Sequence, residues 1–134
     1  MKRICWMSNH PINEDQQADL HRMFGEDCLV LELPPEGKRI WGNIPPDAGF
    51  YKVQYLFWEA CRTINLCDLD MDAMVVMGEL SMCLAAALWC MENGVSLYTP
   101  TTAMESREET LPDGSVRKTN VLRHVLLRRL HYAA

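Results

Sequence analysis

Short apolar runs alternate with longer amphipathic segments along most of the chain. Residues 73–77 are apolar throughout, as is typical of a strand buried on both faces of a parallel sheet, and residues 3–7 and 28–33 have a similar character. Over residues 50–64 apolar side chains recur every three or four positions, which indicates a helix packed by one face. Residues 95–98 form a fourth apolar run. This alternation predicts a parallel sheet with right-handed crossovers and helices on both faces.

Capping residues mark the ends of the expected helices. Asn13 is followed three positions later by Gln16, a spacing that predicts a capping box at the start of a helix that Gly25 ends. A further helix is expected over residues 79–92, with Gly94 closing it.

Two segments depart from the alternation. Residues 34–46 contain four prolines and two glycines, so we expect a loop there, pinned to the core by Trp41 and Ile44. In the tail, the sequence Pro112-Asp113-Gly114 between two extended segments predicts a β-hairpin. Periodicity allows helix or strand over residues 121–130, and we favour a strand to about residue 127 because it continues the hairpin.

Length and charge narrow the fold and the partners. A chain of 134 residues suits one domain, so we expect a Rossmann-like, mostly parallel α/β domain over residues 1–134 with a C-terminal hairpin extension. The net charge is −5, but residues 107–134 hold six basic and three acidic groups (+3), which leaves 7 basic and 15 acidic groups (−8) elsewhere. An acidic body does not suit duplex DNA. The basic end suits a small polyanion, or else it is a solvated strand face.

The six cysteines indicate the compartment. None lies in a C-x-x-C pair, and the apolar run after Met1-Lys2-Arg3 is too short for a signal peptide, so we expect reduced thiols and a cytoplasmic protein. The longest apolar stretch, residues 80–91, is too short to cross a bilayer, which needs about 20 residues. We therefore expect a buried helix or an oligomer interface there, and no membrane partner.

Polar residues follow three of the predicted strands. Ligands of open parallel sheets bind outside the carboxyl ends of the strands, which directs attention to residues 8–10, 78–81 and 99–102. His10 is suited to general acid–base work, and the helix start after Gly78 has free N–H groups for a phosphate. Glu79 would repel phosphate there unless it bonds a hydroxyl or acts as a base, and we expect burial at the sheet edge to raise its pKa. Ordinary turns explain the same residues.

Several familiar sites are missing from the sequence. Neither the dinucleotide fingerprint, the P-loop nor the serine elbow occurs, and the histidines and cysteines show no zinc-ligand spacing. Asp68, Asp70 and Asp72 lack the rest of a calcium loop and indicate a solvated turn. No metal or other cofactor is expected.

A series of motifs in this order resembles one family. They are Ser8-Asn9-His10-Pro11-Ile12 with Gln16 and Asp19, Trp41-Gly-Asn-Ile-Pro-Pro46, Val76-Met-Gly-Glu79, Tyr98-Thr-Pro-Thr-Thr102, Arg107, Asp113-Gly-Ser115, Lys118, and His124-Val125 followed by Arg128. Over nearly the whole chain the sequence resembles the small CRISPR-associated proteins of type III systems, which are related to CARF (CRISPR-associated Rossmann fold) domains and proposed to be ring nucleases.

The resemblance implies a specific activity. Such proteins bind cyclic oligoadenylate, the second messenger made when a type III complex detects foreign RNA, as homodimers with the ring across the two-fold axis. A ring nuclease cuts the ring and ends the response. In the usual metal-free route the ribose 2′-hydroxyl attacks its own phosphate, so the protein supplies positioning, proton transfer and charge stabilisation.

The resemblance also suggests roles for residues. His10 or Glu79 would move the proton, and the apolar helix over residues 80–91 would supply a dimer face. The residues expected to contact the ring lie at strand ends and along the tail: Ser8, Asn9, Gly78, Ser81, Thr101, Thr102, Arg107, Lys118, Arg123, His124 and Arg128. For His124, a structural role in its strand is the favoured interpretation.

Other functions remain open at this stage. A sensor or sponge would bind the ring without cutting it, using the same residue types. An unrelated Rossmann-like enzyme on a nucleotide or sugar phosphate is disfavoured by the missing glycine fingerprint, and an RNA-binding accessory protein by the acidic body.

Overall fold

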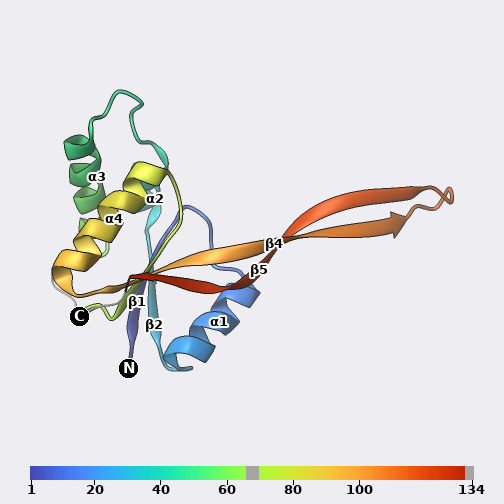
Figure 1. The fold of residues 1–134 in the computed structure, drawn as a ribbon, viewed down its shortest axis with the longest axis horizontal. Helices are drawn as coiled ribbons and strands as arrows, with labels where there is room; N and C mark the ends of the chain where they lie inside the picture. The colour runs from blue at the N-terminus through green and yellow to red at the C-terminus, as the bar shows by residue number, and fades with distance from the viewer. Residues whose placement is uncertain (66–69, 132–134) are drawn as a thin grey trace.

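A computed structural model describes residues 1–65 and 70–131. The elements follow in the order β1 (Arg3–Met7), α1 (Glu14–Phe24), β2 (Leu29–Glu32), α2 (Pro35–Gly42), α3 (Phe50–Arg62), β3 (Ala73–Val76), α4 (Leu80–Asn93), β4 (Ser96–Thr110) and β5 (Val116–His131) (Figure 1).

The strands form one sheet in the order β2-β1-β3-β4-β5. β1 pairs in parallel with both β2 and β3, β3 pairs in parallel with β4, and β5 is antiparallel to β4. The predicted Rossmann-like α/β fold with a C-terminal hairpin is therefore confirmed. After β1 the chain builds β2 on one side and then crosses to β3 on the other, so the direction of winding reverses between β1 and β3. That reversal is the position at which sheets of this kind hold ligands.

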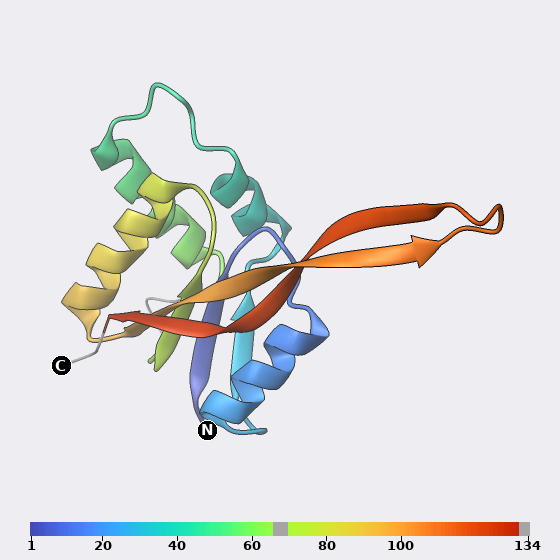
Figure 2. The ribbon, with the colours of Figure 1, turned by 45° about the vertical axis from the view of Figure 1, so that its right-hand side comes forward.

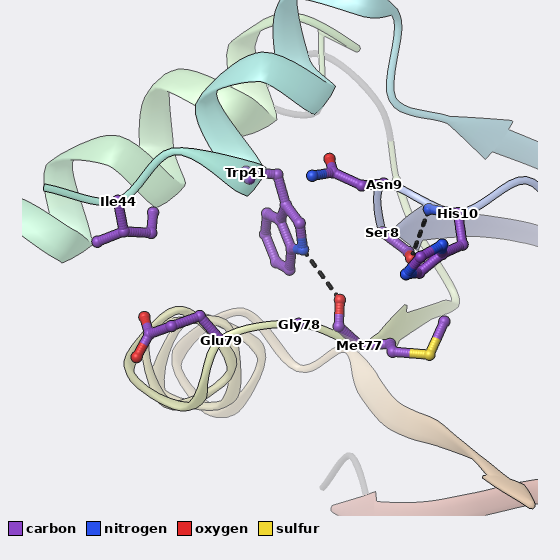
Figure 3. Close-up of a pocket in the computed structure, with 9 residues that line it drawn as sticks. Ser8, Asn9, His10, Trp41, Ile44, Met77, Gly78 and Glu79 are labelled. Carbon is purple, nitrogen blue, oxygen red and sulfur yellow. Dashed lines mark hydrogen bonds between the residues drawn. The ribbon is translucent and has the colours of Figure 1, made fainter.

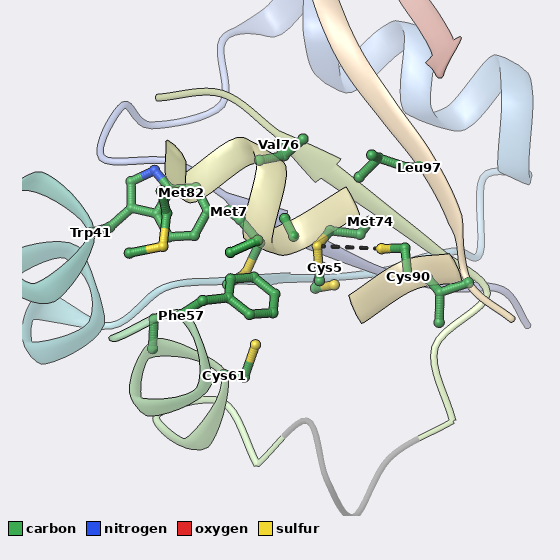
Figure 4. Packing of buried hydrophobic residues seen from close by; sticks show 14 of the residues in the cluster. Cys5, Met7, Trp41, Phe57, Cys61, Met74, Val76, Met82, Cys90 and Leu97 are labelled. Atoms are coloured by element: carbon green, nitrogen blue, oxygen red, sulfur yellow. Dashed lines mark hydrogen bonds between the residues drawn. The ribbon is translucent and has the colours of Figure 1, made fainter. Parts of the chain in front are cut away.

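Helices cover both faces of the sheet, as alternation of buried residues along the strands requires. Ile4, Trp6 and Val75 point to the α1 side and pack with Leu20. The opposite side carries α2, α3 and α4 over a larger cluster of buried side chains (Figures 2 and 4). That cluster includes Cys5, Met7, Trp41, Phe57, Cys61, Met74, Met82 and Cys90.

The predicted helix ends are confirmed at α1 and α4. Asn13 Oδ1 accepts the Gln16 N–H at 2.8 Å, and Gln16 Oε1 accepts the Asn13 N–H at 3.1 Å, which is the expected capping box. Gly94 ends α4 with a left-handed φ of 66°.

The expected loop over residues 34–46 is wrong in its first part, because α2 occupies Pro35–Gly42. Pro35 is compatible with a helix since it stands in the first turn, where its missing N–H has no partner to lose. The expected anchoring is confirmed: Trp41 is buried and Ile44 packs against the same core.

β4 is longer than its apolar run suggests. Residues 99–102 were expected to follow the strand, but β4 continues through them to Thr110. Proline has no backbone N–H to donate to a neighbouring strand. Pro100 is tolerated because β4 pairs with β3 only as far as Tyr98, so no hydrogen bond between these two strands is lost at Pro100. With β5, this extension forms the predicted hairpin, which projects from the body of the molecule (Figures 1 and 2).

α4 packs on the sheet by one side. Met82, Ala85, Ala86 and Cys90 are buried, whereas Leu80, Leu84 and Met91 are exposed. Within residues 1–65 and 70–131, no helix combines the length and the apolar character that crossing a membrane requires.

A buried carboxylate ties α1 to the hairpin. Asp19 Oδ2 accepts the backbone N–H of Leu127 at 2.7 Å and faces His124 Nε2 at 3.2 Å, while Asp19 Oδ1 accepts from Arg22. Burial raises the pKa of Asp19, but the hydrogen bonds from Arg22, Leu127 and His124 outweigh it and hold this pKa below its ordinary value of 3.8. The predicted structural role for His124 agrees with this contact.

Asp19→Ala is expected to lower the free energy of unfolding by about 2–3 kcal/mol, because it leaves a buried N–H of Leu127 without an acceptor. Since the pKa of Asp19 is lowered on folding, its contribution is complete above pH about 4 and is lost as pH falls further. Urea unfolding of the wild type and of Asp19→Asn at a series of pH values should show a difference that shrinks below pH about 4. Asp15→Ala, an exposed acid in the same helix, should cost less than about 1 kcal/mol. A pH-independent difference for Asp19→Asn would contradict the assignment.

Candidate functional site

A pocket of about 290 Å³ lies beyond the carboxyl ends of β1 and β3, at the point where the winding reverses. Its lining comes from the β1–α1 turn, the end of α2 and the β3–α4 turn: Ser8, Asn9, His10, Trp41, Gly42, Ile44, Met77, Gly78 and Glu79. Figure 3 shows Ile44 and Glu79 at one end, Ser8 and His10 at the other, and Trp41 between them. Five of these residues were predicted from the sequence to lie at strand ends, and the fold brings all five together: Ser8, Asn9, His10, Gly78 and Glu79.

The Trp41 indole forms the wall of the pocket and connects α2 to β3. Its Nε1 donates to the carbonyl oxygen of Met77 at 2.9 Å. Gly78 lies directly beside the ring with a φ of 155°, and a Cβ at this position would come within 2.6 Å of Trp41 Nε1. A glycine is therefore required here both by its backbone conformation and by the close approach of the indole.

Asn9 makes a second connection between a strand end and α2. In the orientation that satisfies both ends of its amide, Nδ2 donates to the Lys38 carbonyl at 2.6 Å and Oδ1 accepts the Gly42 N–H at 3.2 Å. A Cβ on Gly42 would stand 2.0 Å from this amide, so the contact depends on glycine. Asn9 thus holds the pocket wall in place, and its capacity for a ligand is reduced by these bonds.

His10 stands at the exposed rim of the pocket. Its backbone N–H donates to the buried Ser8 Oγ at 3.0 Å, which fixes the turn that carries the imidazole. The ring lies beside the Ser8 side chain, at the end of the pocket away from Ile44 and Glu79 (Figure 3). Imidazole accepts and donates protons near neutral pH, so this position suits general acid–base catalysis.

Glu79 serves as the N-cap of α4. Its carboxylate accepts the N–H groups of Ser81 and Met82 at 3.0 and 3.4 Å, as well as the Ser81 hydroxyl. These bonds, the Ser81 hydroxyl first, lower the pKa of Glu79. Our expectation that burial would raise this pKa is therefore wrong, since the side chain is exposed and bonded as an anion. The N–H groups expected to hold a phosphate at this helix start are already occupied by Glu79.

A second hollow of about 340 Å³ adjoins the first and shares Ile44 and Glu79 with it. Ser81 lines this second hollow together with Pro45, Pro46, Ala48 and Val53. The two hollows therefore lie next to each other at the start of α4.

The expected cations lie away from the pocket. Arg107 and Arg123 both contact Glu105, with N–O distances of 3.5 and 2.7 Å, and Lys118 contacts Glu108 at 3.7 Å. These pairs lie on the projecting part of the hairpin, and none of the three side chains lines either hollow.

Arg128 differs from the other three cations. It is exposed, and among the described residues it forms no ion pair. It stands opposite Thr99 on β4, and the Thr99 hydroxyl donates to the Val76 carbonyl at 2.9 Å. Arg128 is therefore placed two strands from the end of β3, at the edge that carries the pocket.

The threonines expected at a strand end are inside the hairpin. Thr101 Oγ1 donates to the Leu126 carbonyl at 2.6 Å and accepts the Leu126 N–H at 3.2 Å, where the register between β4 and β5 shifts. Thr102 stands opposite His124. Both belong to the hairpin ladder rather than to the pocket lining.

Metal ligation has no ready site in the part of the chain that the structure describes. Across residues 1–65 and 70–131, no three His, Cys, Asp or Glu side chains are grouped closely enough to hold an ion. Asp68 of the expected acidic turn lies outside the described residues, as does Cys67.

Comparison with known proteins gives a family. A family model described as "Uncharacterized protein MJ1673 family" matches residues 2–128. The chain belongs to this family. No curated protein and no solved structure is significantly similar to it. The matched residues include all of the pocket lining.

Proposed function

We propose that this MJ1673 family protein is a cytoplasmic ring nuclease that binds cyclic oligoadenylate and opens it, ending type III CRISPR signalling. The observation that carries the proposal is the pocket at the reversal point between β1 and β3, with His10 at its rim. This is the expected position of a nucleotide in a Rossmann-like sheet. The sequence resemblance to CARF-like proteins supplies the choice of nucleotide.

The chemistry is an internal transesterification. The imidazole of His10 accepts the proton of a ribose 2′-hydroxyl while that oxygen attacks the adjacent phosphorus. The bond from phosphorus to the 5′-oxygen breaks, and the leaving oxygen takes a proton from the imidazolium. The product is a linear oligoadenylate with a 2′,3′-cyclic phosphate and a 5′-hydroxyl, so the reaction balances without a redox partner.

The size of the pocket supports a two-chain arrangement. A volume near 290 Å³ is at the low end of pockets for small ligands, so one chain holds only part of a ring. In a homodimer two such pockets would face the same ligand across a two-fold axis. Each chain would then contribute one His10.

A non-catalytic binder is the second candidate. It is favoured by the state of Glu79, whose carboxylate is bonded to the start of α4 and whose pKa is lowered. Among the described lining residues this leaves His10 as the group suited to proton transfer at neutral pH.

The deciding experiment is incubation of the purified protein with cyclic tri-, tetra- and hexa-adenylate in EDTA, followed by chromatography of the products. We expect one ring to yield linear fragments ending in a 2′,3′-cyclic phosphate. Retention of an uncut ring by the protein would establish the binder instead. Activity that disappears in EDTA and returns with Mn²⁺ would refute the metal-free route, and absence of both binding and cleavage would refute the function.

Arg128→Ala is expected to weaken binding of cyclic oligoadenylate by about tenfold or more, because a charge-assisted contact with phosphate is worth about 1.5–3 kcal/mol. Isothermal titration with the preferred ring would measure this. Arg107→Ala is the matched control and should change the affinity less than about threefold, since its guanidinium is held by Glu105. The reverse order of effects would place the ring on the projecting hairpin.

A further inference from the structure

Residues 103–123 form the part of the hairpin that projects from the body, and we call this part the arm. Because β4 pairs with β3 only from Ser96 to Tyr98, the strands of the arm pair only with each other. Figures 1 and 2 show it extending clear of the helices. A two-stranded hairpin with no third strand or helix against it is marginally stable in water.

One face of the arm carries three ion pairs beside Ala103, Thr119 and Val121. The register places Glu105, Arg107, Glu109, Arg117 and Arg123 on this face, since residues two apart on a strand point the same way. Arg107 and Arg123 pair with Glu105, and Arg117 pairs with Glu109 at 2.9 Å. Because its charged side chains are exposed and paired, this face of the arm can remain in contact with water.

The opposite face carries exposed apolar side chains at both of its ends. Near the body, Met104 stands directly across from Leu122, with 66% and 65% of their surfaces exposed. Near the tip, Thr110 stands across from Val116, which is 57% exposed. Large apolar side chains gathered on one face of an exposed ribbon indicate a surface that is covered in the functional state.

The centre of this face is polar, and its polar groups are paired. Ser106 Oγ donates to Asn120 Oδ1 at 3.0 Å. The next cross-strand pair is Glu108 with Lys118, an ion pair with an N–O distance of 3.7 Å. Along the arm the face therefore runs from apolar to neutral polar, then to an ion pair, and then to apolar.

We infer that the arm packs face to face with the arm of a second copy of this chain, in antiparallel orientation about a two-fold axis. An axis midway between the Ser106–Asn120 and Glu108–Lys118 pairs sets Leu122 of one arm against Val116 of the other. The same axis sets the Ser106–Asn120 pair against the Glu108–Lys118 pair, so no like charges meet. An isologous interface requires such a self-complementary pattern.

Charge on the arm favours a second copy over a polyanion. Four basic residues (Arg107, Arg117, Lys118, Arg123) balance four acidic ones (Glu105, Glu108, Glu109, Asp113), so the net charge of residues 103–123 is zero. Nucleic acids select surfaces with an excess of positive charge. The inference names the contact surface of the homodimer in the proposed function, and in that respect it rests on that proposal.

The first test is the mass of the protein in light scattering at micromolar concentration without ligand. Wild type should show twice the 15.4 kDa of one chain, and Leu122→Lys should show the mass of one chain with an unchanged circular dichroism spectrum. Leu84→Lys on the exposed row of α4 is the matched control and should remain a dimer. A dimer that persists in Leu122→Lys but is lost in Leu84→Lys would overturn the arm contact while leaving the homodimer intact. A monomeric wild type would overturn both.

The second test places cysteines at Val116 and Leu122 together. These positions are six residues apart on one strand, about 20 Å, so a disulfide between them within one chain is impossible. Val116→Cys/Leu122→Cys should form covalent dimers on mild oxidation, and Leu84→Cys under the same conditions should not. Absence of covalent dimers would overturn the stated register. Binding of single-stranded RNA that Leu122→Lys abolishes, together with a monomeric mass, would assign the arm to RNA instead.

Discussion

His10→Ala should reduce turnover of cyclic oligoadenylate by about 10²–10⁴-fold, the usual effect of removing a general acid or base, while binding of the ring survives. The separation of the two effects is expected because His10 is an exposed residue at the rim of the pocket, whereas the buried Trp41 forms its wall. The backbone N–H that bonds Ser8 Oγ remains in the variant, so the turn keeps its shape. Single-turnover rates and the dissociation constant measured on the same preparation would show the difference.

The matched control is His21→Ala, which removes a histidine from the outer side of α1. It should retain close to the wild-type rate. If His10→Ala also retains that rate, the proton is moved by a different group. The other histidine given a site role, His124, is buried against Asp19 and would need an opening of the hairpin base to reach a substrate.

Trp41→Ala should lower the free energy of unfolding by about 3–5 kcal/mol, the range for removing a buried large aromatic side chain. The indole is 2% exposed, packs against Phe57 and donates to the carbonyl of Met77. Its loss leaves a void, frees that carbonyl and removes the main attachment of α2. Binding of any ligand in the pocket should be lost with it, because Trp41 forms the wall.

Trp58→Ala provides the same chemical change at an exposed position. Trp58 is 43% exposed on α3 and stacks with the Arg62 guanidinium, so its removal should cost about 1 kcal/mol or less. Urea unfolding of the two variants would give the comparison. Equal losses would show that the Trp41 contact does not hold α2 in place.

The sequence predicted those parts of the fold that depend on neighbours along the chain. Asn13 and Gln16 cap α1 through bonds spanning three residues, and the turn at Asp113 joins adjacent strands, so both could be identified from local pattern. The pocket residues at the ends of β1 and β3 followed from strand order, because the carboxyl ends of parallel strands meet at one edge.

The predictions that were wrong concern elements fixed by contacts between residues far apart in the sequence. α2 was missed because Pro35 and its glycines suggest a loop, whereas a bond from Trp41 to Met77, 36 residues away, fixes the helix against the sheet. Trp41 itself was expected to be an anchor and not a pocket wall. A lone tryptophan in a segment rich in proline and glycine was the one available signal.

Charge pairing was equally hidden from the sequence. Basic residues of the tail suggested an anion site, but the antiparallel register sets Lys118 directly opposite Glu108 and Arg117 opposite Glu109. Net charge over a window of sequence does not show which side chains face one another across a ladder. Arg128 is the basic residue that the register leaves beside the edge with the pocket.

The sequence distances within the sheet imply an order of assembly. The paired residues of β4 and β5 are close in sequence, since the most distant pair is Leu97 with His131. The contacts of the rest of the sheet join residues much further apart: β1 pairs Ile4 with Ala73 of β3, and Asp19 bonds Leu127 across 108 residues. Short loops close at lower entropic cost, so the hairpin can form while the parallel sheet is still incomplete. During synthesis its strands also emerge after β1, β2 and β3. In the proposed dimer the ribbon that forms most readily would keep its apolar side chains exposed until a second chain covers them, so the yield of folded protein would depend on the local concentration of new chains.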